Sequence, residues 1–319
     1  MKKFCVKMVL FLLLLGVSVT GLLVLSAREP FRSVVATITK STQYGQGYNE
    51  GPSEIIPYIN KVQQQDGYTK LILGDSVSFR LFSELQEENP EYCIASSNRA
   101  ITMSGQYILA SEFLESHPEA TDIYLTVIED SLATTYETGY GYQYAVIPFV
   151  LTDTIDNLDE ETMDEMGHVY GHFFMKKKVV QLVSDSPLNR KLYLNILNKV
   201  APSTSGLTFP NVTNVYIVKL HSLCEEKGVT LHLIPLPVMD TQERHDMETV
   251  LRKEYEKTPM AEIYPDYFDQ FIYYPPEKFS DNVHVAGTRE ELNDMIREIQ
   301  QKTNTMEDLV LEEGDENAF

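Results

Sequence analysis

Short apolar runs alternate with amphipathic stretches over most of the chain. The first run after residue 65 is Lys70-Leu71-Ile72-Leu73-Gly74, which ends in glycine and predicts a buried strand. Similar strands are expected at 92–95, 123–128, 229–236 and 271–274, with helices at 77–87, 104–115, 212–227, 240–257 and 287–303. This alternation predicts an α/β fold, a three-layer α/β/α sandwich with a mainly parallel central sheet.

The N-terminus carries an uncharged stretch, residues 8–27, that follows three lysines and precedes Arg28. This is the length that a helix needs to cross a bilayer. Positive charge before the stretch predicts a cytoplasmic N-terminus with the remainder exported. A cleaved signal peptide is the alternative, but Leu25 departs from the small-x-small pattern before Ala27. We therefore expect one transmembrane helix that anchors an extracytoplasmic domain to the cell membrane.

The domain boundaries follow changes in composition. Residues 1–27 are the cytoplasmic N-terminus and anchor, and the polar, glycine-containing residues 28–65 are expected to form a juxtamembrane linker. The α/β domain then covers 66–303. Residues 132–210 break its rhythm and predict a mainly helical insertion, while the acidic tail, 304–319, is expected to be frayed.

Charge and cysteine content exclude several function classes. The formal net charge of −21 argues against nucleic-acid binding, which needs a basic surface. Cys93 and Cys224 are expected to be buried thiols, since no cysteine spacing indicates a disulfide framework or a zinc site. His168 and His172 could form a metal pair on one helix face, but surface histidines are favoured because no glutamate completes a zinc-protease pattern. We expect no metal and no cofactor.

Two short segments carry candidate chemistry. Ser76 follows Gly74 and Asp75 at the carboxyl edge of the first expected strand, where a helix N-terminus offers free N–H groups to an oxyanion. Asp281 and His284 precede the closing helix, and a histidine oriented by a carboxylate can take a serine proton. Taken alone, each segment is more simply explained as a helix cap or a loop.

Together the two segments resemble the SGNH (GDSL-like) hydrolases, in which a Gly-Asp-Ser follows the first strand and an Asp-x-x-His precedes the last helix. The resemblance covers residues 68–303. It implies that Ser76 is the nucleophile, His284 the general base and Asp281 the carboxylate that orients the imidazole.

The family has two further short sequence motifs, its second and third blocks, which fit less well. The second block, after the second strand, usually supplies a glycine whose N–H binds the oxyanion. Gly105, with Asn98 upstream, occupies that place. The third normally reads Gly-x-Asn-Asp, but here it is Val127-Ile128-Glu129-Asp130. An ionised Glu129 cannot donate a hydrogen bond. Either Glu129 is protonated, or Ser131 or water replaces it as the donor, or the activity is weak or lost. Gly105, Asn98, Glu129 and Asp75 are the tentative oxyanion or substrate residues.

The anchor and the degenerate middle blocks resemble one branch of this superfamily, which includes the D-alanyl transfer protein of teichoic-acid operons and exopolysaccharide O-acetyltransferases. The resemblance implies a serine esterase or O-acyltransferase that acts on acyl groups of a cell-surface glycopolymer. It allows a membrane-bound acyl-donor protein as a further partner. One alternative is a catalytically degenerate domain that binds a glycan or assembles an export complex; another is an unrelated α/β binding domain. Tyr140, Tyr142 and Tyr144 are expected to shape the mouth of the site.

Overall fold

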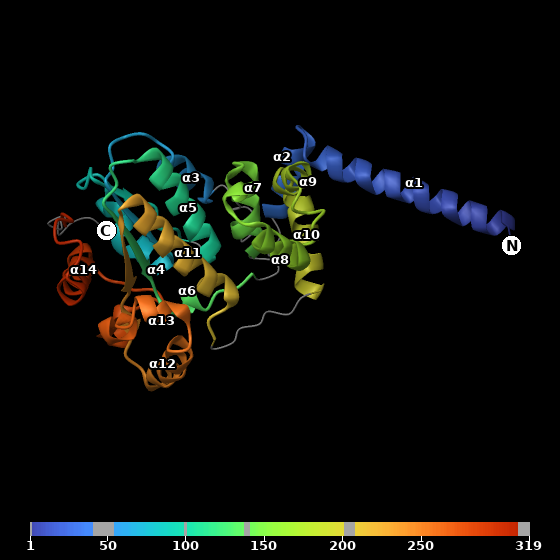
Figure 1. The fold of residues 1–319 in the computed structure, drawn as a ribbon. Helices are drawn as coiled ribbons and strands as arrows, with labels where there is room; N and C mark the ends of the chain where they lie inside the picture. Colours follow the sequence, from blue (N-terminus) through green and yellow to red (C-terminus); the bar gives the residue numbers. More distant parts are fainter. Residues whose placement is uncertain (1, 41–53, 99–100, 137–140, 201–207, 312–319) are drawn as a thin grey trace.

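The computed structural model describes residues 2–40, 54–98, 101–136, 141–200 and 208–311. Its central sheet has four parallel strands in the order β2-β1-β3-β4 (Figure 1). The strands are β1 (Lys70–Gly74), β2 (Tyr92–Ile94), β3 (Asp122–Val127) and β4 (Thr230–Pro235). The apolar runs become strands because their side chains are buried on both faces. The expected α/β fold with a parallel sheet is confirmed.

The helices of the α/β part include five that come close to the expected ranges and three short ones, at 56–62, 129–132 and 259–263, that were not predicted. They are α3 (Ile56–Val62), α4 (Ser76–Phe82), α5 (Met103–Ser116), α6 (Glu129–Leu132), α11 (Asn211–Lys227), α12 (Gln242–Tyr255), α13 (Pro259–Ile263) and α14 (Arg289–Thr303). α11 and α3 pack against α5, and α14 packs against α4. α11 ends at Gly228, which adopts the left-handed conformation that favours glycine at a helix end.

The strand order creates a switch point between β1 and β3. The chain leaves β1 toward β2 on one side, whereas β3 continues to β4 on the other. In such sheets the crevice for ligands opens at the carboxyl ends of the two central strands. The turn from β1 into α4 needs Gly74, because a Cβ there would lie 2.3 Å from the Thr126 carbonyl oxygen. The chain can therefore enter α4 directly at the switch point.

Three expectations need correction. Residues 55–62 were expected within a linker, but Ile55, Ile59 and Val62 are fully buried in the domain core. The expected last strand, 271–274, pairs only as β6 (Tyr273–Tyr274) with β5 (Val238–Met239), in a separate two-stranded sheet. A two-residue pairing is too short to extend the central sheet.

The start of the acidic tail is also not frayed. Asp308 accepts a hydrogen bond from the Tyr92 hydroxyl at 2.6 Å and forms an ion pair with Lys70. Val310 N–H donates to Asn89 at 2.7 Å, and Leu309 is buried. These contacts hold the tail across the edge of the sheet. Residues 312–319 lie outside the described residues.

Residues 141–200 form the helical insertion. It contains a short π-helix (Tyr142–Val146), α7 (Ile147–Leu151), α8 (Glu160–Tyr170), α9 (Lys177–Ser184) and α10 (Pro187–Val200). The chain turns between α8 and α9 at Gly171, where φ is +86°. The insertion packs beside α5 (Figure 1), and Asn157 donates a 2.6 Å hydrogen bond to Glu112 of that helix.

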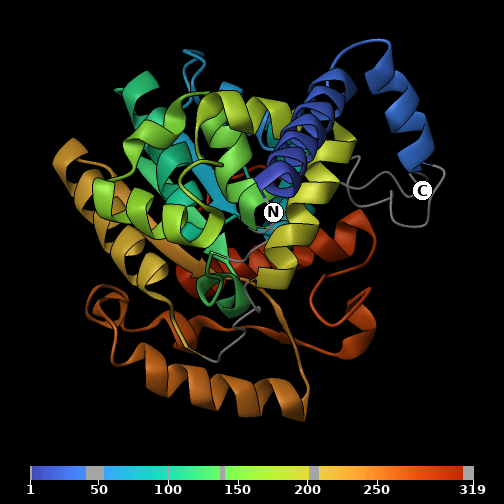
Figure 2. The same cartoon turned by 90° about the vertical axis from the view of Figure 1, so that its right-hand side faces the viewer.

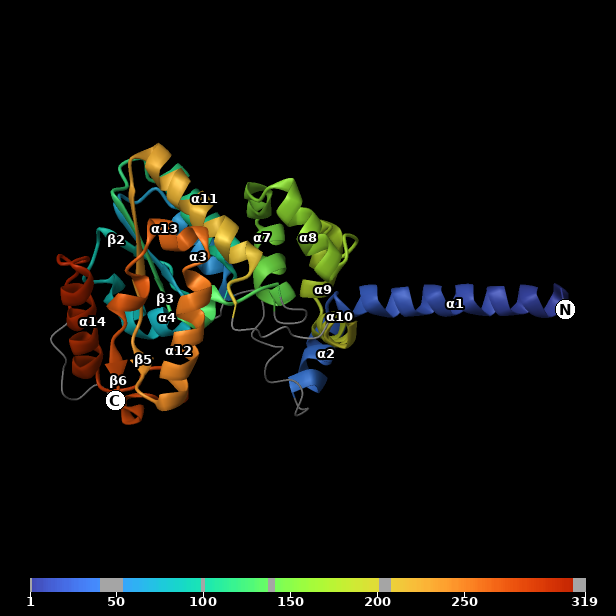
Figure 3. The same cartoon turned by 60° about the horizontal axis from the view of Figure 1, so that its bottom comes forward.

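The N-terminal helix α1 (Lys2–Ser26) is the one helix in the described residues that is long and apolar enough to cross a membrane. It projects away from the sheet and leads into α2 (Phe31–Lys40) (Figure 3). Its end runs beside α10 (Figure 2). Buried Asn189 donates to the Leu23 carbonyl at 3.0 Å, and the Ser26 and Ser186 hydroxyls lie 2.7 Å apart. The insertion is therefore fixed to the end of α1.

Both predicted buried thiols, Cys93 and Cys224, are confirmed. Burial raises the pKa of each to about 12. A thiol with such a pKa is poorly nucleophilic at neutral pH, so neither cysteine is a candidate for catalysis.

Replacing Asn189 should loosen the junction between α1 and the insertion. Asn189→Ala leaves the Leu23 and Leu182 carbonyls without their buried donor, so the expected cost is about 1–3 kcal/mol. Hydrogen exchange on the full chain in detergent should show faster exchange in 177–200. Exposed Asn195→Ala in α10 is the matched control, and an equal acceleration there would contradict the role of Asn189.

Candidate active site

Ser76 and His284 meet at the switch point. Ser76 is the first residue of α4, and its Oγ lies 2.8 Å from the Nε2 of His284, which is 208 positions away in the sequence. Both side chains are half-buried, so the pair is sheltered but reachable. The predicted contact between the two residues is present.

Asp281 holds the imidazole from its other side. Its Oδ2 and Oδ1 lie 2.8 and 3.0 Å from His284 Nδ1. Oδ1 also accepts the backbone N–H groups of His284 at 2.7 Å and Val283 at 2.9 Å. These backbone hydrogen bonds, with the imidazole contact, lower the pKa of Asp281 to about 2. An ionised Asp281 accepts the Nδ1 proton, which leaves Nε2 free to accept the serine proton.

Arg80 ties the histidine turn to the serine helix. It lies one turn after Ser76 in α4, and its guanidinium donates to Ser280 Oγ at 2.8 Å and to the Val285 carbonyl at 3.1 Å. Ser280 N–H and the His284 carbonyl close the turn at 2.9 Å. Sequence reasoning did not identify Arg80. The available signal was its spacing of four from Ser76, which places both residues on one helix face.

Asp75 has a structural role rather than the tentative substrate role. It is buried, and its Oδ1 accepts the N–H groups of Val77 at 2.9 Å and Ser78 at 3.2 Å. Its Oδ2 accepts Ile128 N–H at 3.0 Å and the Ser131 hydroxyl at 2.6 Å. The carboxylate thus caps α4 and clamps it to the end of β3. Ser131, considered above as a substitute oxyanion donor, gives its proton to this clamp.

One candidate from the second block has its N–H already hydrogen-bonded, and the other is exposed. The Gly105 N–H donates to the Thr102 carbonyl at 2.8 Å, because Gly105 lies inside the first turn of α5. A Cβ on Gly105 would lie 3.2 Å from the Phe149 ring, so the glycine makes room for the insertion. Asn98 is exposed in the bend after β2. The oxyanion role of Gly105 is therefore corrected to a packing role.

Glu129 is fully buried and forms an ion pair with Arg244 of α12. Arg244 Nη2 lies 2.8 Å from Glu129 Oε1, and Nη1 donates to Asp130 at 2.9 Å. Neither Glu129 oxygen receives a well-aligned hydrogen bond. Burial raises the pKa of Glu129 to about 7, although the Arg244 charge opposes this shift. Glu129 is thus poised to be protonated near neutral pH, one of the states considered from sequence.

A pocket of about 180 Å³ opens next to this pair. Its lining is Met239, Thr241, Glu243, Arg244, Met247 and Asn282. Asn282 lies between Asp281 and His284 in the sequence, so the pocket adjoins the histidine turn. Sequence reasoning missed this lining because α12 is a charged, surface-type helix without a motif. The pocket combines apolar methionine side chains with one guanidinium.

Two of the three tyrosines expected at the mouth of the site do not line it. Tyr142 and Tyr144 are buried inside the helical insertion, which was not apparent from their spacing. Tyr140 lies outside the described residues. Tyr136 instead donates to the Ser104 hydroxyl at 3.0 Å, on the first turn of α5. The insertion therefore covers the start of α5 at the carboxyl edge of the sheet.

A comparison of the chain with protein-family models gave no match, and searches of curated proteins and of solved structures found no significant similarity. The site geometry therefore stands without support from a relative.

The raised pKa of Glu129 predicts a pH dependence of stability. The folded state binds a proton more tightly than the unfolded chain, so unfolding free energy should fall as pH rises from about 4.5 to about 7. A shift of this size corresponds to about 3 kcal/mol. Denaturant titrations of Glu129→Gln at several pH values should not show this fall in unfolding free energy, since glutamine does not titrate. Exposed Glu243→Gln is the control. If the free energy of unfolding of Glu129→Gln still fell with pH as it does in the wild type, the assignment would be contradicted.

Proposed function

We propose that this chain is a membrane-anchored, extracytoplasmic serine esterase or O-acyltransferase of the SGNH type, acting on acyl groups of a cell-surface glycopolymer. The observation that carries the proposal is the 2.8 Å contact between Ser76 Oγ and His284 Nε2, with Asp281 at Nδ1. Two segments from opposite ends of the domain meet at the carboxyl edge of the sheet, the place where open parallel sheets generally bind ligands. Packing of α3, α5 and α11 together, and of α14 on α4, supports the three-layer sandwich that the family implies.

The reaction begins with attack of Ser76 Oγ on an ester carbonyl. His284 Nε2 takes the hydroxyl proton, and the Asp281 carboxylate stabilises the imidazolium. The carbonyl oxygen becomes an oxyanion near the start of α4. Asp75 already accepts the N–H groups of Val77 and Ser78, so the Ser76 N–H is the first-turn donor left for the oxyanion. His284 then protonates the leaving alkoxide, and the acyl group stays on Ser76.

The second half-reaction decides between hydrolysis and transfer. His284 takes a proton from the incoming hydroxyl, whose oxygen attacks the acyl-enzyme carbonyl. The bond between Ser76 Oγ and the acyl carbon then breaks, and His284 returns the proton to Ser76 Oγ. Water gives an acid, whereas a sugar hydroxyl gives a new ester. The pocket beside Asn282 is the nearest space for the acyl or acceptor group. A membrane-bound acyl-donor protein is compatible with the transfer direction, because α1 would hold the site close to the bilayer.

Glu129 favours a second candidate function. It replaces the asparagine that donates to the oxyanion in the family and is instead buried against Arg244. A domain that has lost this donor could bind a glycan or assemble an export complex without catalysis. The intact Ser76, His284 and Asp281 geometry supports the enzyme over this alternative.

Ser76→Ala tests the choice. The variant should lose labelling by a fluorophosphonate and lower acyl transfer by roughly 10⁴- to 10⁶-fold, because the nucleophile is gone. Its free energy of unfolding should change by less than about 1 kcal/mol. Adding His284→Ala should cost little more, since the residues act as one unit.

Ser83→Ala, just beyond α4, is the matched control and should label like the wild type. Absence of labelling in the wild-type chain, together with normal polymer acylation in cells that carry Ser76→Ala, would favour the binding protein.

A further inference from the structure

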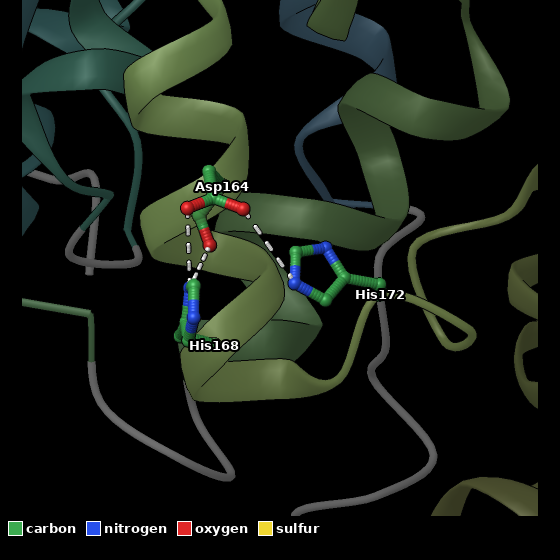
Figure 4. A group of neighbouring side chains, drawn as sticks. All are labelled: Asp164, His168 and His172. Atoms are coloured by element: carbon green, nitrogen blue, oxygen red, sulfur yellow. Dashed lines mark hydrogen bonds and ion pairs between the residues drawn. The ribbon is translucent and has the colours of Figure 1, made fainter.

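Three side chains with metal-ligating atoms converge at the end of α8 (Figure 4). Asp164 and His168 lie one helical turn apart, and His172 follows the end of the helix. His168 Nδ1 is 3.4 Å from Asp164 Oδ2, and His172 Nε2 is 3.7 Å from Asp164 Oδ1. One ligand atom from each residue lies within 4.8 Å of the others. All three side chains are exposed, so an ion from solution can reach them.

Two glycines bring His172 back to the helix. Gly171 ends α8 with a φ of +86°, which reverses the chain. Gly167 provides the space, because a Cβ there would lie 2.1 Å from His172 Nδ1. The imidazole therefore lies on the helix surface, with its ring centre 5.3 Å from that of His168. Any larger residue at 167 would displace it.

The contacts of Phe174 fix the turn that carries His172. Phe174 N–H donates to the Gly171 carbonyl at 2.8 Å, and the Phe174 carbonyl accepts the Tyr142 hydroxyl at 2.8 Å. The Phe174 ring also stacks on Tyr193 with centres 4.1 Å apart. The backbone around His172 is thus held in place without an ion, which lowers the cost of ordering the ligands.

The donor set indicates the class of ion. Two imidazoles and a carboxylate suit Zn²⁺, Ni²⁺ or Cu²⁺ better than Ca²⁺ or Mg²⁺, which prefer oxygen ligands. Tetrahedral zinc with bonds near 2.1 Å separates its ligand atoms by about 3.4 Å. The three ligand atoms already lie within 4.8 Å of one another, so the exposed side chains need to close by at most about 1.4 Å to surround an ion. Glu160, Glu161 and Glu165 add negative charge to the same helix and attract cations.

His168 must change one contact to bind. Its Nδ1 lies 2.8 Å from the Asp164 carbonyl oxygen, a hydrogen bond that requires a proton on Nδ1. Metal binding at Nδ1 replaces this hydrogen bond, and the neutral ring then carries its proton on Nε2.

We propose that Asp164, His168 and His172 bind a divalent transition-metal ion such as Zn²⁺, with the remaining coordination positions open to solvent. The ion ties α8 to the turn before α9. The site uses no residue of the Ser76 centre, so it is independent of the proposed function.

Zinc titration calorimetry on the full chain in detergent tests the proposal, with Co²⁺ absorption as a second probe. One ion should bind per chain. His168→Ala and His172→Ala should each raise the dissociation constant at least ~10-fold, since even the loss of a group that only orients a ligand can cost that much. His245→Ala is the matched control, because His245 is exposed and lies 2.8 Å from Asp240, and no third metal-ligating side chain joins them among the described residues.

Gly167→Ala tests whether zinc binding depends on the position of His172 and not only on the presence of the three ligands. It keeps all three ligands and favours the helix, so the metal-free chain should melt at the same temperature or higher. Zinc should bind more weakly because the methyl group displaces His172. Wild-type affinity in Gly167→Ala, or equal binding by wild type and His168→Ala, would overturn the proposal.

Discussion

The buried carboxylate of Asp75 is the interaction on which the rest of the site depends. Removing a carboxylate from water is costly unless donors surround it. Here four donors do so, two from the start of α4 and two from the segment after β3. The same atoms therefore place Ser76 at the helix start and hold the segment that carries Glu129 against α4. Asp75, which the sequence suggests as a substrate residue, instead connects the segments that follow the two central strands, β1 and β3.

The sequence was most informative where one local pattern determined the structure. Buried parallel strands need continuous apolar runs, so β1 and β3 could be found directly. The rule that strand ends meet at one edge then brought Ser76 and His284 together. The contacts of Arg80 and Asp308 could not be found in this way. Each joins distant segments through one exposed or half-exposed side chain. The spacing of Arg80 from Ser76 indicates its helix face, but no local pattern identifies the distant segment that either residue contacts.

The errors at Gly105 and Tyr142 have a related cause. Whether an N–H is free depends on the first-turn geometry of its helix, and Gly105 has already used its proton within α5. Whether a tyrosine lines a cleft depends on the packing of a whole insertion, and Tyr142 is in its interior. Residue type suggested a role in both cases, but local burial determined it. Glu129 was correctly singled out, although its partner, Arg244, lies in a helix that no motif distinguishes.

The distance in sequence between Ser76 and His284 has a consequence for biosynthesis. A chain that emerges N-terminus first exposes the serine long before the last helix has been made, and the imidazole is then absent. Under the proposed function, a nascent or truncated polypeptide carries an unactivated alcohol and cannot modify esters that it meets during export. Ser76 becomes a nucleophile only when the C-terminal turn that carries His284 docks on Arg80. The proposed activity therefore begins only after synthesis of the polypeptide is complete.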